Sequence, residues 1–312
     1  DVPIINPAAY LDWENIPLSP RELTKFKKGL AKSVTAADIL FNAKLRTRPY
    51  EIHKGETDSL FEELNKELVD IVERGCNFKE LTLFMKRSIQ RIQAVPKTDE
   101  RYPKVSMFGE IFVRCHTGAN QESIRMLEEN KLEVSPKLVS DMFQYNNQMQ
   151  RAAFWKEKDY KKWLNALIKG LYLKRVEKVL YQPFKEYLSD RTQKNPIELY
   201  KQLMDDNIFH IKIKGEAGIS IGESYEFINS NLDGICGIYQ LNPFGCMQEC
   251  VATSKIQSLI DKKRASATDS KHKIIPYLNG VFGDSELPNL EAEMAMFSEK
   301  CHTRRELHLK KP

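Results

Sequence analysis

Cysteine is scarce in this sequence, and neither sign of charge is in large excess. Six cysteines in 312 residues are too few for a disulfide scaffold, so a cysteine with a role is better suited to metal ligation or redox chemistry. Lysine and arginine number 48 against 43 aspartates and glutamates, and the two signs are interspersed. A net charge of only +5 gives no indication of nucleic-acid binding.

Long apolar runs are absent as well. No stretch of about 18 apolar residues occurs, and residues 1–17 lack the basic start and apolar run of a signal peptide. We therefore predict a cytoplasmic protein without a membrane partner. The sequence begins at Asp1 rather than at a methionine, and we expect it to be part of a longer polypeptide.

Motifs for common cofactors are missing too. The pattern G-x-G-x-x-G does not follow the first predicted strand, and G-x-x-x-x-G-K followed by Ser or Thr is not found. NAD and FAD are therefore disfavoured, and no nucleotide site is evident in this chain. Cys-x-x-Cys pairs are also lacking, so the sequence alone does not indicate a closed zinc site.

The first third of the chain has a helical pattern. Apolar residues recur at three- and four-residue spacing over residues 19–94, and a charged tract with two prolines follows at 94–103. We predict that residues 1–95 form a helical N-terminal segment, which is either the remnant of a preceding domain or a linker from it.

A polar tract at residues 46–58 lies within this segment and is open to two interpretations. Arg46, Arg48 and Lys54 have the charge to anchor the phosphates of CoA. The alternative is that these side chains form a solvated, salt-bridged surface.

From residue 104 the pattern alternates between strands and helices. Predicted strands cover residues 104–113, 132–135, 234–241 and 273–278. Predicted helices cover residues 120–129, 219–229, 247–262 and 288–297. This order is typical of α/β proteins, and we predict a Rossmann-like parallel sheet over residues 104–300. A helical insertion at about 140–205, rich in aromatic residues, is expected to form a cap with a buried aromatic core.

Cysteines follow two of the predicted strands. Cys115 comes shortly after the strand at 104–113 and Cys246 after the strand at 234–241, and carboxyl ends of parallel strands lie at one edge of a sheet. Cys246 also directly precedes a predicted helix, where the helix dipole favours the thiolate, and Cys250 lies one turn further. We predict these three thiols as metal ligands, and a buried space-filling role is the alternative for each.

Two further motifs accompany the cysteines. Glu110 lies within the first predicted strand, and Gly215-Glu216 precedes the helix at 219–229. The backbone amides of a glycine turn at the start of a helix can bind a phosphate or a cluster sulfide, and a nearby carboxylate can orient a ligand. We therefore predict Glu110, Gly215 and Glu216 as cofactor-binding residues. A tight turn with a serine cap is the simpler alternative for the second motif.

Five short motifs occur in a defined order along the chain. They are Arg48 to Glu51 with Lys54 to Asp58, Gly109 to Arg114, Gly215 to Ala217, Asn242 to Met247 and Pro288 to Ala292. Over roughly residues 34 to 300, their order resembles the C-terminal region of the CoA-substrate-specific enzyme activases of anaerobic bacteria. In that family, the C-terminal region is similar to 2-hydroxyacyl-CoA dehydratases. The activases in question are of the type that activates 2-hydroxyglutaryl-CoA dehydratase.

The resemblance implies a function as well as a fold. Members of the family carry ATP-binding activase modules, and their dehydratase relatives hold an iron–sulfur cluster on cysteines between Rossmann-like domains. The resemblance implies a ligand role for Cys246 in a four-iron, four-sulfur type of cluster, with further ligands from another domain or subunit. The expected partners are an ATP-binding activase domain or protein, a CoA ester and a second copy of the chain.

Three functions are therefore open. The first is an iron–sulfur, dehydratase/activase-like module in ATP-coupled, low-potential electron transfer to a CoA-ester dehydratase or reductase. The second is a non-catalytic Rossmann-like interaction domain that docks an ATPase partner. The third is a zinc-binding structural module that uses Cys246, Cys250 and a histidine. Whether the chain is an enzyme by itself does not follow from the sequence.

Overall fold

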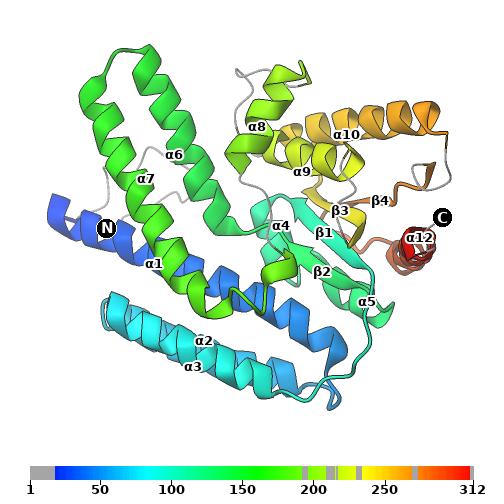
Figure 1. The fold of residues 1–312 in the computed structure, drawn as a ribbon, viewed down its shortest axis with the longest axis horizontal. Helices are drawn as coiled ribbons and strands as arrows, with labels where there is room; N and C mark the ends of the chain where they lie inside the picture. Colours follow the sequence, from blue (N-terminus) through cyan, green and yellow to red (C-terminus); the bar gives the residue numbers. More distant parts are fainter. Residues whose placement is uncertain are drawn as a thin grey trace.

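The computed structural model describes residues 18–191, 196–208, 215, 217–229, 234–268 and 273–309 (Figure 1). Its α-helices are α1 (Pro20–Thr47), α2 (Glu56–Glu73), α3 (Phe78–Ala94), α4 (Ile111–Cys115), α5 (Ser123–Glu129), α6 (Val139–Lys156), α7 (Tyr160–Tyr181), α8 (Pro196–Asp205), α9 (Ala217–Asn229), α10 (Met247–Ser266) and α12 (Leu290–Leu309). Its strands are β1 (Lys104–Gly109), β2 (Glu133–Pro136), β3 (Ile235–Pro243) and β4 (Tyr277–Phe282). No helix of this described part is both long and apolar enough to cross a bilayer.

The strands form one parallel sheet in the order β2-β1-β3-β4, which confirms the predicted Rossmann-like α/β class. Both faces of the sheet are covered: α5 and α12 pack on one face, and α9 and α10 pack on the other (Figure 1). Strands buried on both faces are apolar at successive positions rather than at alternate ones. Ile238 and Tyr239 in β3 follow this rule, because both are fully buried and they belong to opposite core clusters.

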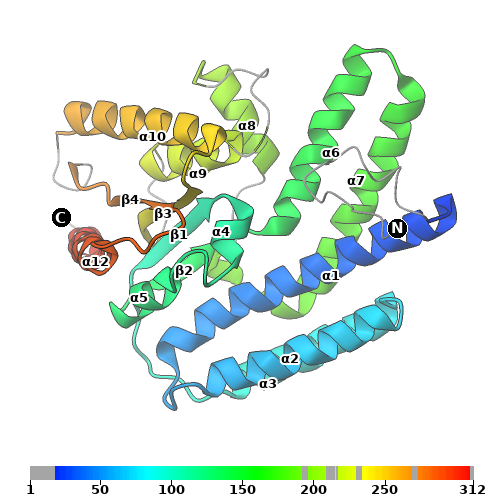
Figure 2. The ribbon, with the colours of Figure 1, turned by 180° about the vertical axis from the view of Figure 1, so that it is seen from behind.

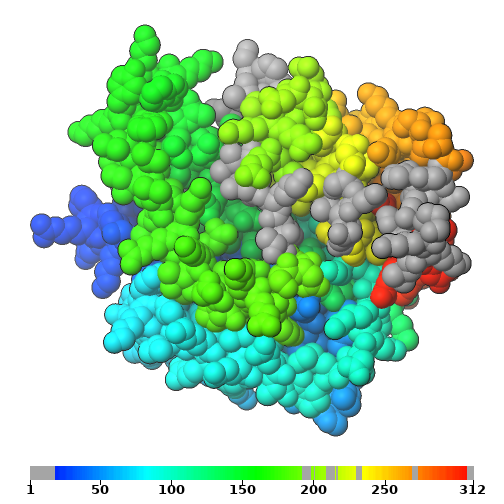
Figure 3. All heavy atoms as spheres, in the orientation of Figure 1, coloured from blue at the N-terminus to red at the C-terminus, as the bar shows by residue number. Residues whose placement is uncertain are grey.

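A body of helices adjoins the sheet. Figure 2 shows α1 between the α2–α3 hairpin and the α6–α7 hairpin. Buried side chains of α1, α2 and α3 share one core cluster with Val176, Leu180, Phe184 and Leu188 from α7 and the residues after it. The helical pattern predicted over residues 19–94 is confirmed, and it resolves into three helices. In the space-filling view the α6–α7 hairpin forms one corner of the molecule (Figure 3).

The prediction of a buried aromatic cap is wrong at the tip of this hairpin. Trp155 and Tyr160 are each 59% exposed, although Tyr145 near the base of α6 is only 2% exposed. The two exposed rings contact each other edge to face, with centroids 5.8 Å apart. Helices α6 and α7 pack mainly on each other and on α1, so the tip extends past the surfaces that would cover it.

Two predicted strand boundaries are also wrong. The first strand ends at Gly109 rather than at residue 113, because Glu110 acts as the N-cap of α4. The strand predicted at 273–278 lies at β4, four residues further along. Asn279-Gly280 has the composition of a turn, yet it pairs with β3 in the parallel register of the sheet.

Ion pairs hold the two arginines of the polar tract at residues 46–58, and the buried pair of Arg48 with Glu128 joins the helical body to a helix that covers the sheet. Arg48 contacts Glu128 of α5 at 2.7 Å and Asp58 of α2 at 3.1 Å. Arg46 pairs with Asp190. These contacts confirm the predicted salt bridges for both arginines of the tract, but Arg48 is buried rather than solvated.

Asp38 of α1 is a buried carboxylate that meets the start of α6. It is 7% exposed and accepts a 2.6 Å hydrogen bond from the Ser140 amide. Burial raises the pKa of Asp38 to about 6, and the hydrogen bonds from Ser140 only partly oppose this effect. An unfolded aspartate titrates near pH 4, so between about pH 4 and pH 6 the folded state binds the extra proton. Stability therefore falls as the pH rises through this window.

We expect Asp38→Asn to raise the free energy of unfolding by about 2 kcal/mol at pH 7 and to change it little at pH 4. The amide keeps an acceptor for Ser140 but has no charge to desolvate. Urea unfolding across this pH range measures the difference, and the exposed Asp70→Asn is the matched control. An equal effect of Asp38→Asn at both pH values would contradict the argument.

Candidate functional site

The carboxyl edge of the sheet is the place where the predicted site residues gather. Glu110 follows β1, Lys137 follows β2, and the turn that ends at Cys246 follows β3. These strands are parallel neighbours, so their carboxyl ends share one edge, as predicted. Ligands of parallel α/β sheets bind at this edge.

Gly109 allows β1 and β3 to approach each other closely at this edge. Its φ is +116°, and a Cβ at this position would lie 2.1 Å from the carbonyl oxygen of Leu241. The amide of Glu110 donates a 2.9 Å hydrogen bond to the same oxygen. Only glycine fits here, so the glycine of the Gly-Glu motif has a structural reason.

One carboxylate oxygen of Glu110 has a local structural role. Its Oε2 accepts a 2.8 Å hydrogen bond from the Val113 amide and so caps α4. The residue lies at the predicted edge, and its role in binding a cofactor stays a prediction.

Cys246 occupies the N-cap position of α10, as predicted. The residue is partly exposed, and its thiol makes no capping hydrogen bond. Its neighbours Phe244 and Met247 are 83% and 77% exposed. Cys250 lies one turn further along α10 and is exposed. The turn therefore presents a thiol within a rim of exposed apolar side chains.

Cys115 ends α4 and is exposed near the same edge. The residue as a whole is exposed, but its thiol is partly desolvated, which raises the pKa of the thiol; the adjacent Arg114 opposes this only in part. A thiol shifted in this direction is a poorer metal ligand than a thiolate. The ligand role of Cys115 stays a prediction.

Gly215 lies beside the first turn of α10. Its φ is +93°, and a Cβ there would lie 2.1 Å from the side-chain oxygen of Gln248. Gly215 therefore lies close to Gln248, which is two residues after Cys246. Glu216 lies outside the described residues.

The described residues do not make a complete metal site. Among them, no group of three or more histidine, cysteine, aspartate or glutamate side chains is arranged to hold a metal ion. An iron–sulfur cluster is usually held by about four thiolates. The donors in the described part of the chain therefore do not fit a whole cluster, and Cys246 with Cys250 would supply only part of one.

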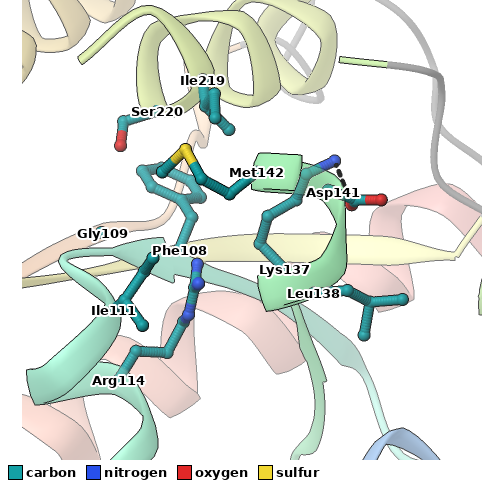
Figure 4. A pocket seen from close by; sticks show the side chains of 10 residues that line it. All are labelled: Phe108, Gly109, Ile111, Arg114, Lys137, Leu138, Asp141, Met142, Ile219 and Ser220. Atoms are coloured by element: carbon teal, nitrogen blue, oxygen red, sulfur yellow. Dashed lines mark ion pairs between the residues drawn. The ribbon is translucent and has the colours of Figure 1, made fainter. Parts of the chain in front are cut away.

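A narrow pocket lies at this edge between β1, α4, α6 and α9 (Figure 4). Its space is about 10 Å³, which is room for about one water molecule. Figure 4 shows Arg114 pointing from α4 toward Phe108; Arg114 is 4% exposed, and its Nε has no hydrogen-bond partner in the described part of the chain. Lys137 also lines the pocket, but it contacts Glu223 at 2.6 Å and Asp141 at 3.1 Å. The guanidinium of Arg114 is thus the group best placed to meet a small anionic or polar ligand.

A buried carboxylate lies in the first turn of α10, between the two cysteines. Glu249 is 1% exposed and accepts hydrogen bonds from Gln240 at 2.7 Å and from Ser220 at 3.2 Å. Burial raises the pKa of Glu249 despite these hydrogen bonds. Tyr277 extends the network with a 2.6 Å hydrogen bond to Gln240. Side chains of α9, α10, β3 and β4 are thereby joined beneath the cysteine turn.

The sequence does not single out Arg114, Lys137 or Glu249 as site residues. Arg114 belongs to the Gly-Glu motif, and Lys137 directly follows a strand at the ligand-binding edge. The sequence therefore contained evidence by which both could have been identified as site residues. The sequence contained no such evidence for Glu249, because an acidic residue in the first turn of a helix is ordinarily solvated and interacts with the helix dipole.

Comparison with known proteins gives no relative for this chain. No family model, no curated protein and no solved structure matches it. The chemistry of the site therefore follows from its geometry and its residues.

Proposed function

We propose that this chain is a 2-hydroxyacyl-CoA dehydratase-like module that supplies Cys246 to an iron–sulfur cluster completed by a second polypeptide. The observation that carries the proposal is the position of Cys246, a partly exposed N-cap thiol at the carboxyl edge of a parallel sheet. Cys250 is the second candidate donor. A second copy of the chain is the simplest source of further ligands, because the described residues hold no complete donor set.

The surroundings of Cys246 support a shared site. Phe244 and Met247 flank it, and Phe112 on α4 at the same edge is 60% exposed. Exposed apolar groups that gather in one place are typical of a contact surface. Contact with a second chain would cover the thiol and keep water from a cluster, which is how a protein tunes the potential of such a group.

Other parts of the proposal follow from the resemblance of the motifs. They are delivery of the electron by an ATP-hydrolysing activase, a CoA-ester substrate and a cytoplasmic location. A bound cluster would supply the low-potential electron transfer. The chain's own contribution is the thiol at the edge, with Arg114 as a neighbouring cation.

Anaerobic reconstitution with iron and sulfide tests the proposal. Matching amounts of iron and acid-labile sulfide, a broad visible absorbance and a species larger than the monomer would support it. A colourless chain that carries zinc would favour the structural zinc module. A chain without metal at every protein concentration would contradict the cluster proposal.

An interaction domain is the second candidate function, and the apolar rim at Cys246 favours it. In this case Phe244 and Met247 contact an ATPase partner, and the thiol has no metal. The signature would be a metal-free chain in which Phe244→Ser weakens partner binding and Cys246→Ser does not.

A further inference from the structure

A groove with strong positive charge lies in the helical body, between α1, the turn that joins α2 to α3, and α7. Its volume is about 430 Å³, within the range of small-molecule sites. Arg21, Lys25, Lys28 and Lys32 line it. Their spacing of four, three and four residues places all four side chains on one face of α1.

These four cations have no acidic partners in the part of the chain that the structure describes. No aspartate or glutamate lines the groove there, and no ion pair joins any of the four to a described carboxylate. A second wide groove, near Tyr50, contrasts with this one because Asp99 and Glu133 line it. Unbalanced positive charge in a concave site raises the local concentration of anions.

The ammonium groups reach both walls of the groove. Lys25 lies against the α2–α3 turn, where a Cβ on Gly75 would be 3.7 Å from its Nζ. Lys32 donates a hydrogen bond to a carbonyl of the same turn. Lys28 reaches the other wall, where its Nζ lies 5.7 Å from the ring centroid of Tyr172. A ligand with more than one phosphate would meet several of these groups at once.

Two aromatic side chains complete the lining. Tyr172 and Phe78 are partly buried and line the groove together with the four cations. Aromatic faces beside cations suit a planar ring that carries negative groups.

We propose that this groove binds an organic diphosphate or triphosphate with a planar ring, of the nucleoside diphosphate kind. The cations hold the phosphates, and the aromatic wall contacts the ring. The site needs no glycine-rich loop, so the missing motifs do not bear on it. It is also separate from the cysteine edge, so either proposal can fail without the other.

Isothermal titration calorimetry of the full chain at low ionic strength tests the groove, with ADP, pyrophosphate and adenosine as probes. We expect ADP to bind more tightly than pyrophosphate, and adenosine to bind at least about tenfold more weakly than ADP. Lys25→Ala/Lys28→Ala should weaken ADP binding at least about tenfold, because hydrogen bonds to charged groups are strong. Tyr172→Leu should weaken the binding of ADP and leave that of pyrophosphate unchanged.

The control removes the same charge elsewhere on the helical body. Lys66→Ala/Lys86→Ala changes exposed lysines of α2 and α3 outside the groove and should alter ADP binding by less than about twofold. Equal weakening in both double variants would mean non-specific attraction and would overturn the proposal. Absence of binding by ADP and pyrophosphate would also overturn it. Tighter binding of single-stranded RNA than of ADP, through the same lysines, would overturn it as well.

Discussion

Gly109→Ala is expected to lower the free energy of unfolding by about 3 to 5 kcal/mol. Two effects add. The backbone φ of +116° is one that residues with a side chain rarely adopt, and the new Cβ would lie 2.1 Å from the carbonyl oxygen of Leu241. To relieve this overlap, β1 and β3 must separate at the carboxyl edge, which breaks the hydrogen bond from the Glu110 amide to Leu241. Urea unfolding followed by circular dichroism measures the loss.

Gly55→Ala separates the two effects. Gly55 has a φ of +90°, but a Cβ at this position would meet no atom of the described residues within 4 Å. Only the backbone strain remains there, and we expect a loss of about 1 kcal/mol. If both substitutions cost the same, the close approach of β1 and β3 is not the reason for glycine at position 109.

Lys137→Met is the second substitution with a large expected effect, a loss of about 3 to 5 kcal/mol. The side chain of Lys137 is 2% exposed, and its ammonium lies 2.6 Å from Glu223 and 3.1 Å from Asp141. Methionine keeps the volume but leaves two carboxylates without a cation. Thermal or urea unfolding of the purified variant measures the change.

The pH dependence of this variant identifies its cause. Burial already raises the pKa of Glu223, and loss of Lys137 removes the charge that opposes the rise. A raised carboxyl pKa means that stability is lost as the pH increases, so the deficit of Lys137→Met should be larger at pH 8 than at pH 5.

Two further variants complete the test of this ion pair. Lys137→Met/Glu223→Gln should recover most of the lost stability, because the second change removes a buried charge. Lys162→Met removes an exposed lysine that pairs with Asp159 at 2.9 Å, and we expect unchanged stability. A deficit of Lys137→Met that is the same at both pH values and is not rescued would contradict the buried-charge explanation.

The architecture at the carboxyl edge could be predicted because it depends on local pattern and one general rule. Strand and helix alternation predicted a parallel sheet, and parallel pairing then placed the ends of β1 and β3 together. The position of Cys246 followed from Asn242 to Gly245, which the sequence predicts as a loop between a strand and a helical pattern; the structure extends β3 to Pro243 and keeps Cys246 at the start of the helix. These features need no knowledge of distant contacts.

The charged interior of the site could not be predicted in this way. Lys137 meets Glu223 across 86 positions of sequence, and Glu249 is buried only because α9 and β3 pack over it. The basic face of α1 is visible as a spacing in the sequence. That its four cations lack acidic partners in the described structure depends on how α1 packs against α7 and the α2–α3 turn.

At the α6–α7 hairpin the prediction was wrong in the other direction, because aromatic side chains predicted to be buried are exposed. Large rings are usually buried, so Trp155 and Tyr160 were predicted in a core, but each is 59% exposed in the structure. Composition predicts only the average exposure of each type of side chain. The tip of a projecting hairpin is a position that composition does not reveal.

The iron content of Cys246→Ser after anaerobic reconstitution, compared with that of Cys236→Ser, tests the central claim most directly. Cys236 is a buried cysteine of β3, 5% exposed, and it serves as the matched control. Both variants are first checked for an unchanged melting temperature. The cluster proposal predicts that Cys246→Ser loses most of its iron, sulfide and visible absorbance, while Cys236→Ser keeps them. Equal iron in the two variants would contradict a ligand role for Cys246.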